Sequence, residues 1–229
     1  MEISSKKVYD ILTEKGITQL HHANSVITAC QFLREGSLIS RGTVDRNGWF
    51  QTPQESDSID KNLSLWFDVF VDTVDIHDRA KRKNVYGPVL FVLDVAIIKK
   101  AYTGCVWVTR LNPTKWKSKK HEARWFTSAD DLADNFVFGE FDQMIVFRHS
   151  GGELPFGRYL KEVVVDDPKM KKPGMIDFYS MAYGALTLAK TEGEVDVKIK
   201  KRRCPTDCKC VPGYKREPKR TIKMFFPKL

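Results

Sequence analysis

Two kinds of segment are missing from this 229-residue sequence. No run of about 18 apolar residues occurs, so we expect no helix that spans a membrane. The first residues, Met1 to Lys7, lack the apolar stretch of a secretory signal peptide. Only five cysteines are present, and Cys30 and Cys105 lie in apolar settings where a reduced thiol packs as a small hydrophobic side chain. We therefore expect a cytoplasmic protein with reduced thiols.

Positive charge is scarce in most of the chain and is concentrated near its end. Residues 198–229 hold 12 Lys and Arg against two acids, whereas the whole chain has a formal net charge of +9, so residues 1–197 are close to neutral. A basic segment of this kind gains affinity for phosphate backbones by releasing counterions. The alternatives are a solvated tail and an anionic membrane surface, but no amphipathic apolar face accompanies the charge. We expect nucleic acid as the partner, and no membrane.

The composition is that of a globular chain, with 42% apolar and 29% charged residues. Hydrophobic periodicity and capping residues predict helices over residues 6–16, 26–34, 128–136 and 173–190. Short apolar runs predict strands over residues 18–22, 88–95, 106–109, 144–147 and 160–165. The expected fold class is therefore α+β, with a mixed β-sheet core, flanking helices and a basic C-terminal extension.

Three segments are less regular. Residues 42–64 are polar and predict a long loop, and residues 40–54 have the polar composition of a substrate-reading segment. Residues 65–74 fit a strand or a helix equally well, and residues 78–84 read as a charged connector. The basic excess places the expected domain boundary between residues 197 and 198.

The segment from Leu20 to Arg41 has a recognisable order of features. A strand that ends in His22 leads into a helix, then into Gly36 and Leu38, with Arg41 shortly afterwards. This order resembles the opening of the ADP-ribosyltransferase fold, and most closely that of the DarT-type toxins, which attach ADP-ribose to DNA.

The resemblance implies that NAD is the donor substrate. It implies that His22 contacts the nicotinamide ribose and Arg41 the phosphates, with Asn24 at a position where a small hydroxyl residue is common. An imidazole can orient a ribose hydroxyl, and a guanidinium can bind a diphosphate through two hydrogen bonds. The alternative is that His22 is a structural core histidine and Arg41 an ion-pair partner at the surface.

The resemblance extends in patches over residues 18–167 and includes the strands at 65–67, 89–94 and 144–147. DarT-like enzymes carry a catalytic Glu immediately before the last of these strands, and the residue there is Gln143, whereas Glu140 lies three positions earlier. A carboxylate stabilises the oxocarbenium-like charge of ADP-ribosyl transfer, and an amide supplies no charge. We expect either Glu140 to act through a shifted register, or Gln143 to occupy the position in a protein whose transferase activity is weak, altered or absent.

Aromatic and basic residues alternate between positions 107 and 125. Bases stack on such rings while Lys and Arg hold the phosphates, as in single-strand binding. The alternative is a tryptophan-bearing core strand followed by a solvated basic loop. The residues expected to contact nucleic acid, here and in the basic extension, are Lys115, Trp116, Lys117, Lys119, Lys120, Lys201, Arg202 and Arg203.

Two groups of residues have the chemistry of metal ligands, but neither forms a known motif. Asp72, Asp75 and His77 lie close in sequence, and we expect them to serve in hydrogen bonding or helix capping. Cys204, Cys208 and Cys210 offer three thiols where a structural zinc needs four ligands, and no His lies in the basic extension. A fourth ligand would have to come from Cys30 or Cys105, so we expect three reduced thiols and no metal.

The sequence therefore predicts an NAD-dependent ADP-ribosyltransferase-like enzyme that modifies nucleic acid, DNA in preference to RNA. We expect a toxin or defence protein, with a protein partner or antitoxin as a further expectation. One alternative is a non-catalytic nucleic-acid-binding protein on a degenerate version of this fold. Another is a metal-dependent nuclease with acids at 139–142 and at Glu162. The Lys that such a nuclease carries two residues after its second acid is missing here, which counts against this alternative.

Overall fold

A computed structural model describes residues 2–54, 56–100, 104–171 and 176–226 of the chain. Its centre is a mixed sheet of eight strands in the order β1-β6-β7-β4-β2-β5-β9-β10, and a separate pair joins β3 to β8. Neighbouring strands of the large sheet run antiparallel except for β9 and β10, which are parallel. The strands are β1 (Ile3–Ser4), β2 (Gln19–Asn24), β3 (Ser37–Ile39), β4 (Val69–Asp72), β5 (Val89–Asp94), β6 (Cys105–Val108), β7 (Met144–Phe147), β8 (Glu153–Pro155), β9 (Leu160–Val165) and β10 (Lys198–Lys201).

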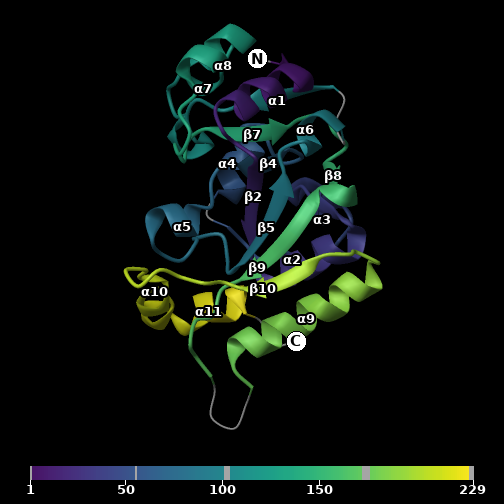
Figure 1. Cartoon of the computed structure of the whole chain (residues 1–229), viewed down its shortest axis with the longest axis vertical. Helices are drawn as coiled ribbons and strands as arrows, with labels where there is room; N and C mark the ends of the chain where they lie inside the picture. Colours follow the sequence, from purple (N-terminus) through teal and green to yellow (C-terminus); the bar gives the residue numbers. More distant parts are fainter. Residues whose placement is uncertain (1, 55, 101–103, 172–175, 227–229) are drawn as a thin grey trace.

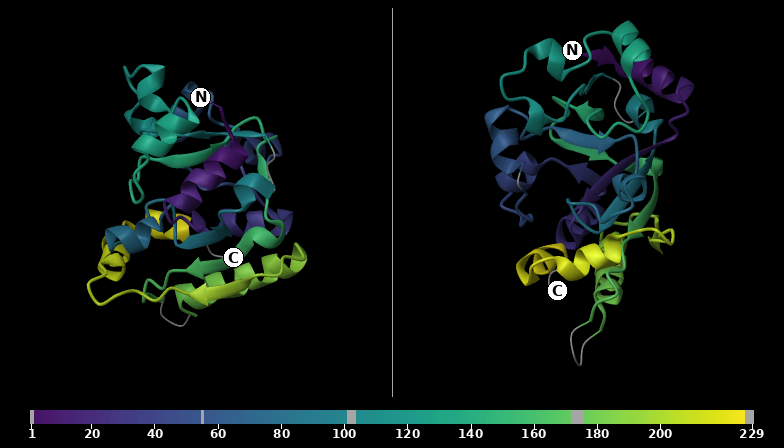
Figure 2. Two further views of the ribbon diagram at one scale, coloured as in Figure 1. Left: turned by 45° about the horizontal axis from the view of Figure 1, so that its top comes forward. Right: turned by 90° about the vertical axis from the view of Figure 1, so that its left-hand side faces the viewer.

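Helices flank this sheet and gather at both ends of an elongated molecule. Those near the N-terminus are α1, α7 and α8, and those at the opposite end are α9, α10 and α11 (Figures 1 and 2). The helices are α1 (Ser5–Glu14), α2 (Val26–Glu35), α3 (Arg41–Arg46), α4 (Asp57–Asn62), α5 (Ile76–Ala80), α6 (Ile97–Lys100), α7 (His121–Arg124), α8 (Ala129–Asn135), α9 (Phe178–Glu192), α10 (Cys210–Arg216) and α11 (Lys219–Phe225), with 3-10 turns η1 (Pro113–Lys115) and η2 (Gly157–Tyr159). Within the described ranges, none of these helices is long and apolar enough to cross a membrane.

The expected mixed sheet with flanking helices is confirmed, and local signals set many of its boundaries. Helix α2 ends at Gly36, which adopts a left-handed φ of 62° and donates its N–H to the carbonyl of Leu33. Glycine suits this position because it has no Cβ to clash in the left-handed region. Helix α8 begins where Ser128 accepts a hydrogen bond from the N–H of Asp131.

Several predicted segments need correction. The expected loop at 42–64 contains α4 and all but the first residue of α3, and the hydroxyl of Ser40 accepts from the N–H of Thr43 to cap α3. The ambiguous run at 65–74 contains the short strand β4, and the connector at 78–84 begins inside α5. The helix expected over 173–190 is α9, whose first turn is capped by Asp177, while positions 173–175 lie outside the described residues.

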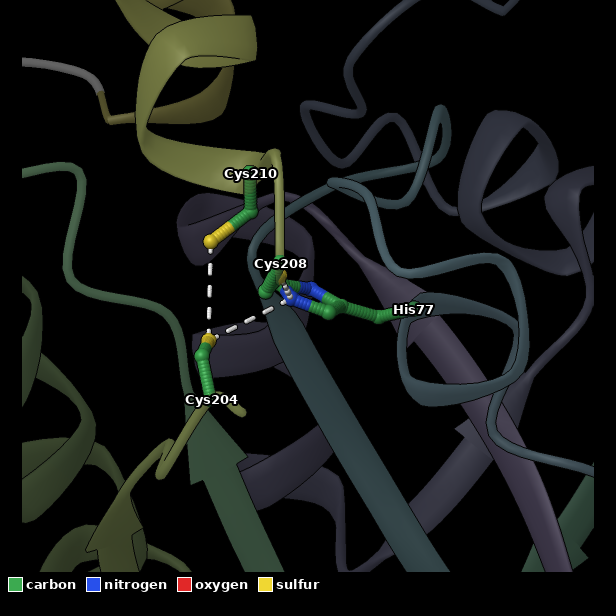
Figure 3. A group of neighbouring side chains, drawn as sticks. All are labelled: His77, Cys204, Cys208 and Cys210. Atoms are coloured by element: carbon green, nitrogen blue, oxygen red, sulfur yellow. Dashed lines mark hydrogen bonds between the residues drawn. The ribbon is translucent and has the colours of Figure 1, made fainter. Parts of the chain in front are cut away.

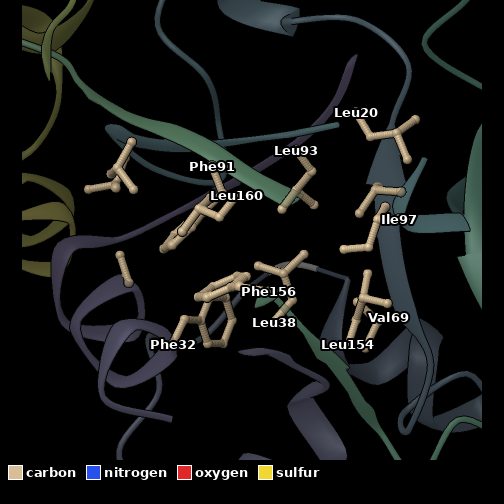
Figure 4. Packing of buried hydrophobic residues seen from close by; sticks show 14 of the residues in the cluster. Leu20, Phe32, Leu38, Val69, Phe91, Leu93, Ile97, Leu154, Phe156 and Leu160 are labelled. Carbon is tan, nitrogen blue, oxygen red and sulfur yellow. The ribbon is translucent and has the colours of Figure 1, made fainter. Parts of the chain in front are cut away.

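The core packs between the sheet and the helices that follow β2. Phe91 of β5 stands in its middle, with its ring centroid 5.8 Å from that of Phe32 and 5.5 Å from that of Phe156 (Figure 4). Leu38 and Leu154 of the paired strands β3 and β8 extend the same buried cluster. Burial of this apolar surface is the main favourable term that holds the strands of the site in place.

Residues 198–226 belong to this fold and are not a detached tail. Strand β10 pairs with β9, with Lys198 opposite Glu162. Tyr214, Ile222 and Phe225 from α10 and α11 are buried in the same hydrophobic cluster as α2 and β5. The predicted boundary at 197/198 thus falls inside one shared core. Apolar residues lie between the Lys and Arg residues of α10 and α11, and they pack these two helices against the rest of the fold.

Candidate functional site

A cleft opens beside α3, where β2 ends and the antiparallel strand β4 begins. Strand β2 contributes His22 and Asn24, α3 contributes Arg41, and β4 contributes Asp72, while η1 closes the opposite side. The empty space in the cleft is about 930 Å³ with its open mouth included. The enclosed part of the cleft is about 110 Å³, smaller than most small-molecule sites, so a ligand of cofactor size would extend into the open mouth. The structure therefore brings together the three residues that the resemblance assigns to NAD.

His22 lines the cleft, and one of its ring nitrogens has no partner among the described residues. Its Nδ1 lies 2.8 Å from the carbonyl oxygen of Phe70, and because a carbonyl only accepts, Nδ1 carries the proton. Its Nε2 is buried and has no hydrogen-bond partner among the described residues. Burial lowers the pKa of His22, with the charge of Arg41 acting in the same direction against the Phe70 hydrogen bond. The ring is thus a neutral acceptor at Nε2.

Arg41 is held by one carboxylate and keeps one nitrogen available. Its Nε lies 2.5 Å from Oδ1 of Asp57, and its Nη2 donates to Oδ2 of Asp57 at 2.7 Å. Nη2 also donates to the carbonyl of Thr52 at 3.0 Å, and the guanidinium lies over the ring of Trp66 at 5.5 Å. The buried Nη1 has no hydrogen-bond partner in the described part of the chain. Arg41 is therefore oriented by an ion pair inside the cleft and can still donate to an anion.

The expected substrate-reading segment forms a wall of the cleft. Gln51 donates from Nε2 to the carbonyl of Arg41 at 3.1 Å, and its buried Oε1 has no partner among the described residues. The hydroxyl of Thr52 lies 2.6 Å from that of Ser25, and the N–H of Ser25 donates to Oδ1 of Asn24 at 2.9 Å. These hydrogen bonds tie the wall to the end of β2.

Three acids line the cleft, and sequence reasoning did not connect them with His22. Burial raises the pKa of Asp60 and of Asp68 to about 6 and that of Asp72 to about 7. Asp68 pairs with Arg148 at 2.9 Å. Asp72 ends β4 and lies opposite His21 in the register with β2. Asp72 could have been identified from the sequence because it ends β4, the strand that neighbours the strand of His22.

The two residues expected to be catalytic lie elsewhere. Glu140 lines a separate hollow with Arg79 and Lys115, which also borders η1. Gln143 accepts a hydrogen bond at Oε1 from the N–H of Val137 at 2.8 Å, so its amide fastens the preceding turn. The structure brings neither side chain into the lining of the cleft that holds His22 and Arg41.

Trp116 is wrongly predicted as a base-stacking residue. Its side chain is 2% exposed, its ring centroid lies 4.7 Å from that of Trp125, and Nε1 donates to the carbonyl of Leu111. Its ring packs against another tryptophan and is not open to a nucleic-acid base. The alternative of a tryptophan core beside a basic loop is therefore correct here. Lys115 is exposed but pairs with Asp142 at 2.6 Å, and Lys117, Lys119 and Lys120 of that loop are also exposed.

The basic residues near β10 also include some that are held in ion pairs within the protein and some that are exposed and have no ion pair among the described residues. Arg202 is mostly buried and pairs with Asp75 and Asp166 at 2.5 Å each, which gives it a structural role. Lys201 pairs with Asp167 at 2.5 Å. Arg203 is exposed and lines a broad groove over the open face of β2, β5, β9 and β10, together with Lys198 and Lys200.

Asp72, Asp75 and His77 do not form a joint metal site. Asp72 faces the cleft, whereas Asp75 caps α5 by accepting from the N–H groups of His77 and Asp78. The expected capping role is confirmed for Asp75. The imidazole of His77 is bonded elsewhere, to Asp166.

No protein-family model matches the chain, and no curated protein matches it. The function is therefore inferred from the cleft itself. It combines a neutral imidazole acceptor, an oriented guanidinium, uncharged amides and carboxyl groups with raised pKa values. Such a set can bind a ligand that carries both hydroxyl groups and an anionic group.

Proposed function

We propose that this protein is an NAD-dependent ADP-ribosyltransferase that modifies nucleic acid, with DNA as the preferred target. The observation that carries the proposal is the pair of buried nitrogens, Nε2 of His22 and Nη1 of Arg41, which have no partner among the described residues and belong to two residues that line one cleft. NAD offers a ribose hydroxyl to the first and a diphosphate to the second. These complement the acceptor and the donor that the cleft leaves unused.

In the proposed reaction, the bond between C1′ of the nicotinamide ribose and the nicotinamide nitrogen breaks, and nicotinamide leaves with the bonding electrons. A nucleophilic atom of the nucleic acid forms the new bond to C1′ and passes its proton to a general base or to water. His22 orients the ribose through a hydrogen bond from a hydroxyl to Nε2. Arg41, fixed by Asp57, holds the diphosphate so that C1′ stays in place.

A carboxylate beside C1′ would stabilise the positive charge that develops there. Asp72 lines the cleft and Glu140 does not, so we assign this role to Asp72. A pKa of about 7 gives Asp72 both protonation states near neutral pH, so its ionised form is present. Gln143 supplies no charge, and its amide is already bonded to Val137.

Exposed basic side chains support nucleic acid as the target. Lys198 and Arg203 form no ion pair with other described residues, and both line the groove over the sheet. Asp72 faces the cleft, and Asp75 lines this groove three residues later, so the two features lie on neighbouring parts of the same segment. A strand held along the groove by phosphate contacts would lie close to the segment at 72–75, which begins in the cleft lining.

The proposal is tested by incubating the full chain with NAD labelled in its adenylate portion and with single-stranded DNA, double-stranded DNA or RNA. We expect label on DNA with the wild type and with Glu140→Gln, and a loss of at least about 100-fold with Asp72→Asn. Transfer that depends on Glu140 and not on Asp72 would overturn the assignment of the carboxylate. Absence of transfer to every target would favour a non-catalytic binding protein, and magnesium-dependent cleavage without NAD would favour a nuclease.

A further inference from the structure

Four side chains with metal-ligating atoms converge at the edge of the molecule away from the cleft. His77 comes from α5, Cys204 and Cys208 from the segment after β10, and Cys210 from the first residue of α10. Figure 3 shows the imidazole and the three thiols turned toward one another. Their ligand atoms all lie within 4.8 Å of one another. The sequence separates His77 from the nearest of the cysteines by 127 positions, so only the fold brings them together.

The distances between the ligand atoms suit a tetrahedral zinc ion. Sγ of Cys204 lies 3.6 Å from Nε2 of His77 and 3.5 Å from Sγ of Cys210, and Sγ of Cys208 lies 3.4 Å from Nε2 of His77. Zinc bonds of about 2.3 Å to sulfur and 2.0–2.1 Å to nitrogen, at tetrahedral angles, give edges of about 3.6–3.8 Å. The four atoms thus already approximate the corners of the tetrahedron, with small changes in side-chain torsions needed to complete it.

Neighbouring residues fix the imidazole in the form that binds a metal. Nδ1 of His77 lies 2.9 Å from Oδ2 of Asp166, which leaves the lone pair of Nε2 directed at the thiols. Asp166 is itself held by the hydroxyl of Tyr214 at 2.6 Å and by Nε of Arg202 at 2.5 Å. A carboxylate behind a metal-binding histidine is the usual outer partner in zinc sites, because it sets the tautomer and orients the ring.

We propose that His77, Cys204, Cys208 and Cys210 bind one structural zinc ion. Three thiolates and an imidazole are the donors that zinc prefers, and four protein ligands leave no open position for a substrate. The metal we infer is therefore structural and independent of the proposed use of NAD. The ligand set differs from the one considered in the sequence, since the fourth ligand is His77 and neither Cys30 nor Cys105.

The position of the cluster suggests what the ion stabilises. The segment at 204–210 joins β10 to α10, and the N–H of Lys209 donates to the carbonyl of Lys81, the residue after α5, at 2.7 Å. Zinc would add a cross-link between α5 and this segment. It would thereby hold Arg203 at the groove and Tyr214 in the core.

The test is the metal content of the full chain purified under reducing conditions without a metal-binding tag. We expect about one zinc ion per chain by elemental mass spectrometry. His77→Ala and Cys208→Ser should lose at least about nine-tenths of it in the presence of a chelator that leaves the wild type loaded. The matched controls are His121→Ala and Cys105→Ser, which remove a histidine and a cysteine outside the cluster and should keep the zinc.

A second measurement uses the wild type alone, so that a variant that fails to fold does not decide the outcome. Reconstitution with cobalt should give the intense visible absorption of a tetrahedral site and a thiolate-to-cobalt charge-transfer band. A chain that neither retains zinc nor gives this spectrum under reducing conditions overturns the proposal. Unchanged zinc content in His77→Ala and Cys208→Ser would place the metal elsewhere, and a disulfide between Cys204 and Cys210 in the protein as isolated would also contradict it.

Discussion

His22 donates a hydrogen bond from Nδ1 to the main-chain carbonyl of Phe70 at 2.8 Å, across the pair of neighbouring strands β2 and β4. This contact decides the tautomer of the ring, and burial keeps the ring neutral by lowering its pKa. The consequence is an acceptor at Nε2 that no described residue uses. A buried acceptor without a partner is costly, so a ligand hydroxyl that satisfies it gains binding energy.

Arg41→Lys should weaken NAD binding although it keeps the positive charge. A lysine cannot bond both oxygens of Asp57 and still donate to a phosphate, because it lacks the planar fork of the guanidinium. We expect the dissociation constant for NAD to rise about tenfold or more, which corresponds to about 1.4 kcal/mol. Isothermal titration calorimetry measures this change. Arg46→Lys, an exposed position of the same helix α3, is the matched control, and equal affinities of wild type and Arg41→Lys would refute the role of Arg41.

Asp72→Asn should stabilise the fold at neutral pH while it abolishes transfer. The pKa of Asp72 is raised from 3.8 to about 7, mainly by burial and also by the nearby Asp75. Between these two values the unfolded chain ionises before the native one, so the acid becomes increasingly unfavourable for folding as pH rises to about 7, and stays so above it. We expect the variant to gain about 1–3 kcal/mol at pH 8 and little near pH 4.

Thermal unfolding of wild type and Asp72→Asn across this pH range measures the difference. Asp134→Asn, which alters an exposed acid of α8, should show no such dependence on pH. A variant of Asp72 that is less stable than the wild type at pH 8 would contradict burial of its carboxyl group.

Two glycines near the same helix should respond to alanine in opposite directions. A Cβ at Gly193 would come within 2.0 Å of the carbonyl oxygen of Leu33 and 2.7 Å of that of Arg34, so Gly193→Ala should push α9 away from α2. We expect a loss of about 1–3 kcal/mol in the free energy of unfolding. A Cβ at Gly184, inside α9, would meet nothing within 4 Å, so Gly184→Ala should gain up to about 1 kcal/mol in helix propensity. Urea unfolding of both variants measures these changes, and a Gly193→Ala protein as stable as the wild type would rule out the close approach of the two helices.

The double variant Lys198→Ala with Arg203→Ala should weaken DNA binding at every sequence. Both side chains are exposed on the groove, and each phosphate contact that is lost reduces the dependence of affinity on salt. We expect the slope of log affinity against log salt to fall by about two. Fluorescence anisotropy at several salt concentrations measures the slope. Lys6→Ala with Lys7→Ala removes the same charge from α1 at the other end of the molecule, and an equal loss in both double variants would mean that the groove is not the binding surface.

Local signals in the sequence were enough where one element decides its own boundaries. The helix that Gly36 ends and the apolar run of β5 were predicted nearly as they stand. The segment at 42–64 was not, because α3 and α4 are each only six residues long. Helix α3 depends on the cap at Ser40, and α4 has neither a side-chain cap nor a buried residue among the described residues. The basic C-terminal region also looked solvated, since the burial of Tyr214 and Phe225 depends on surfaces far away in the sequence.

The part of the site that comes from one continuous segment was predicted, and the contacts between distant segments were not. His22, Asn24 and Arg41 come from one continuous segment, and the structure places them in one cleft. Asp72 and His77 were noticed, but their partners lie on other strands or more than a hundred residues away, and no local pattern reveals such contacts. Trp116 was predicted wrongly because the alternation of aromatic and basic residues does not show which rings are buried.

The central claim is that the cleft binds NAD through His22. Its most direct test is equilibrium binding of NAD to the wild type, to His22→Ala and to the control His121→Ala. We predict saturable binding to the wild type and to His121→Ala, and a dissociation constant at least about tenfold higher for His22→Ala, because the ribose hydroxyl loses its acceptor. No saturable binding to the wild type, or equal affinity in His22→Ala, would contradict the account.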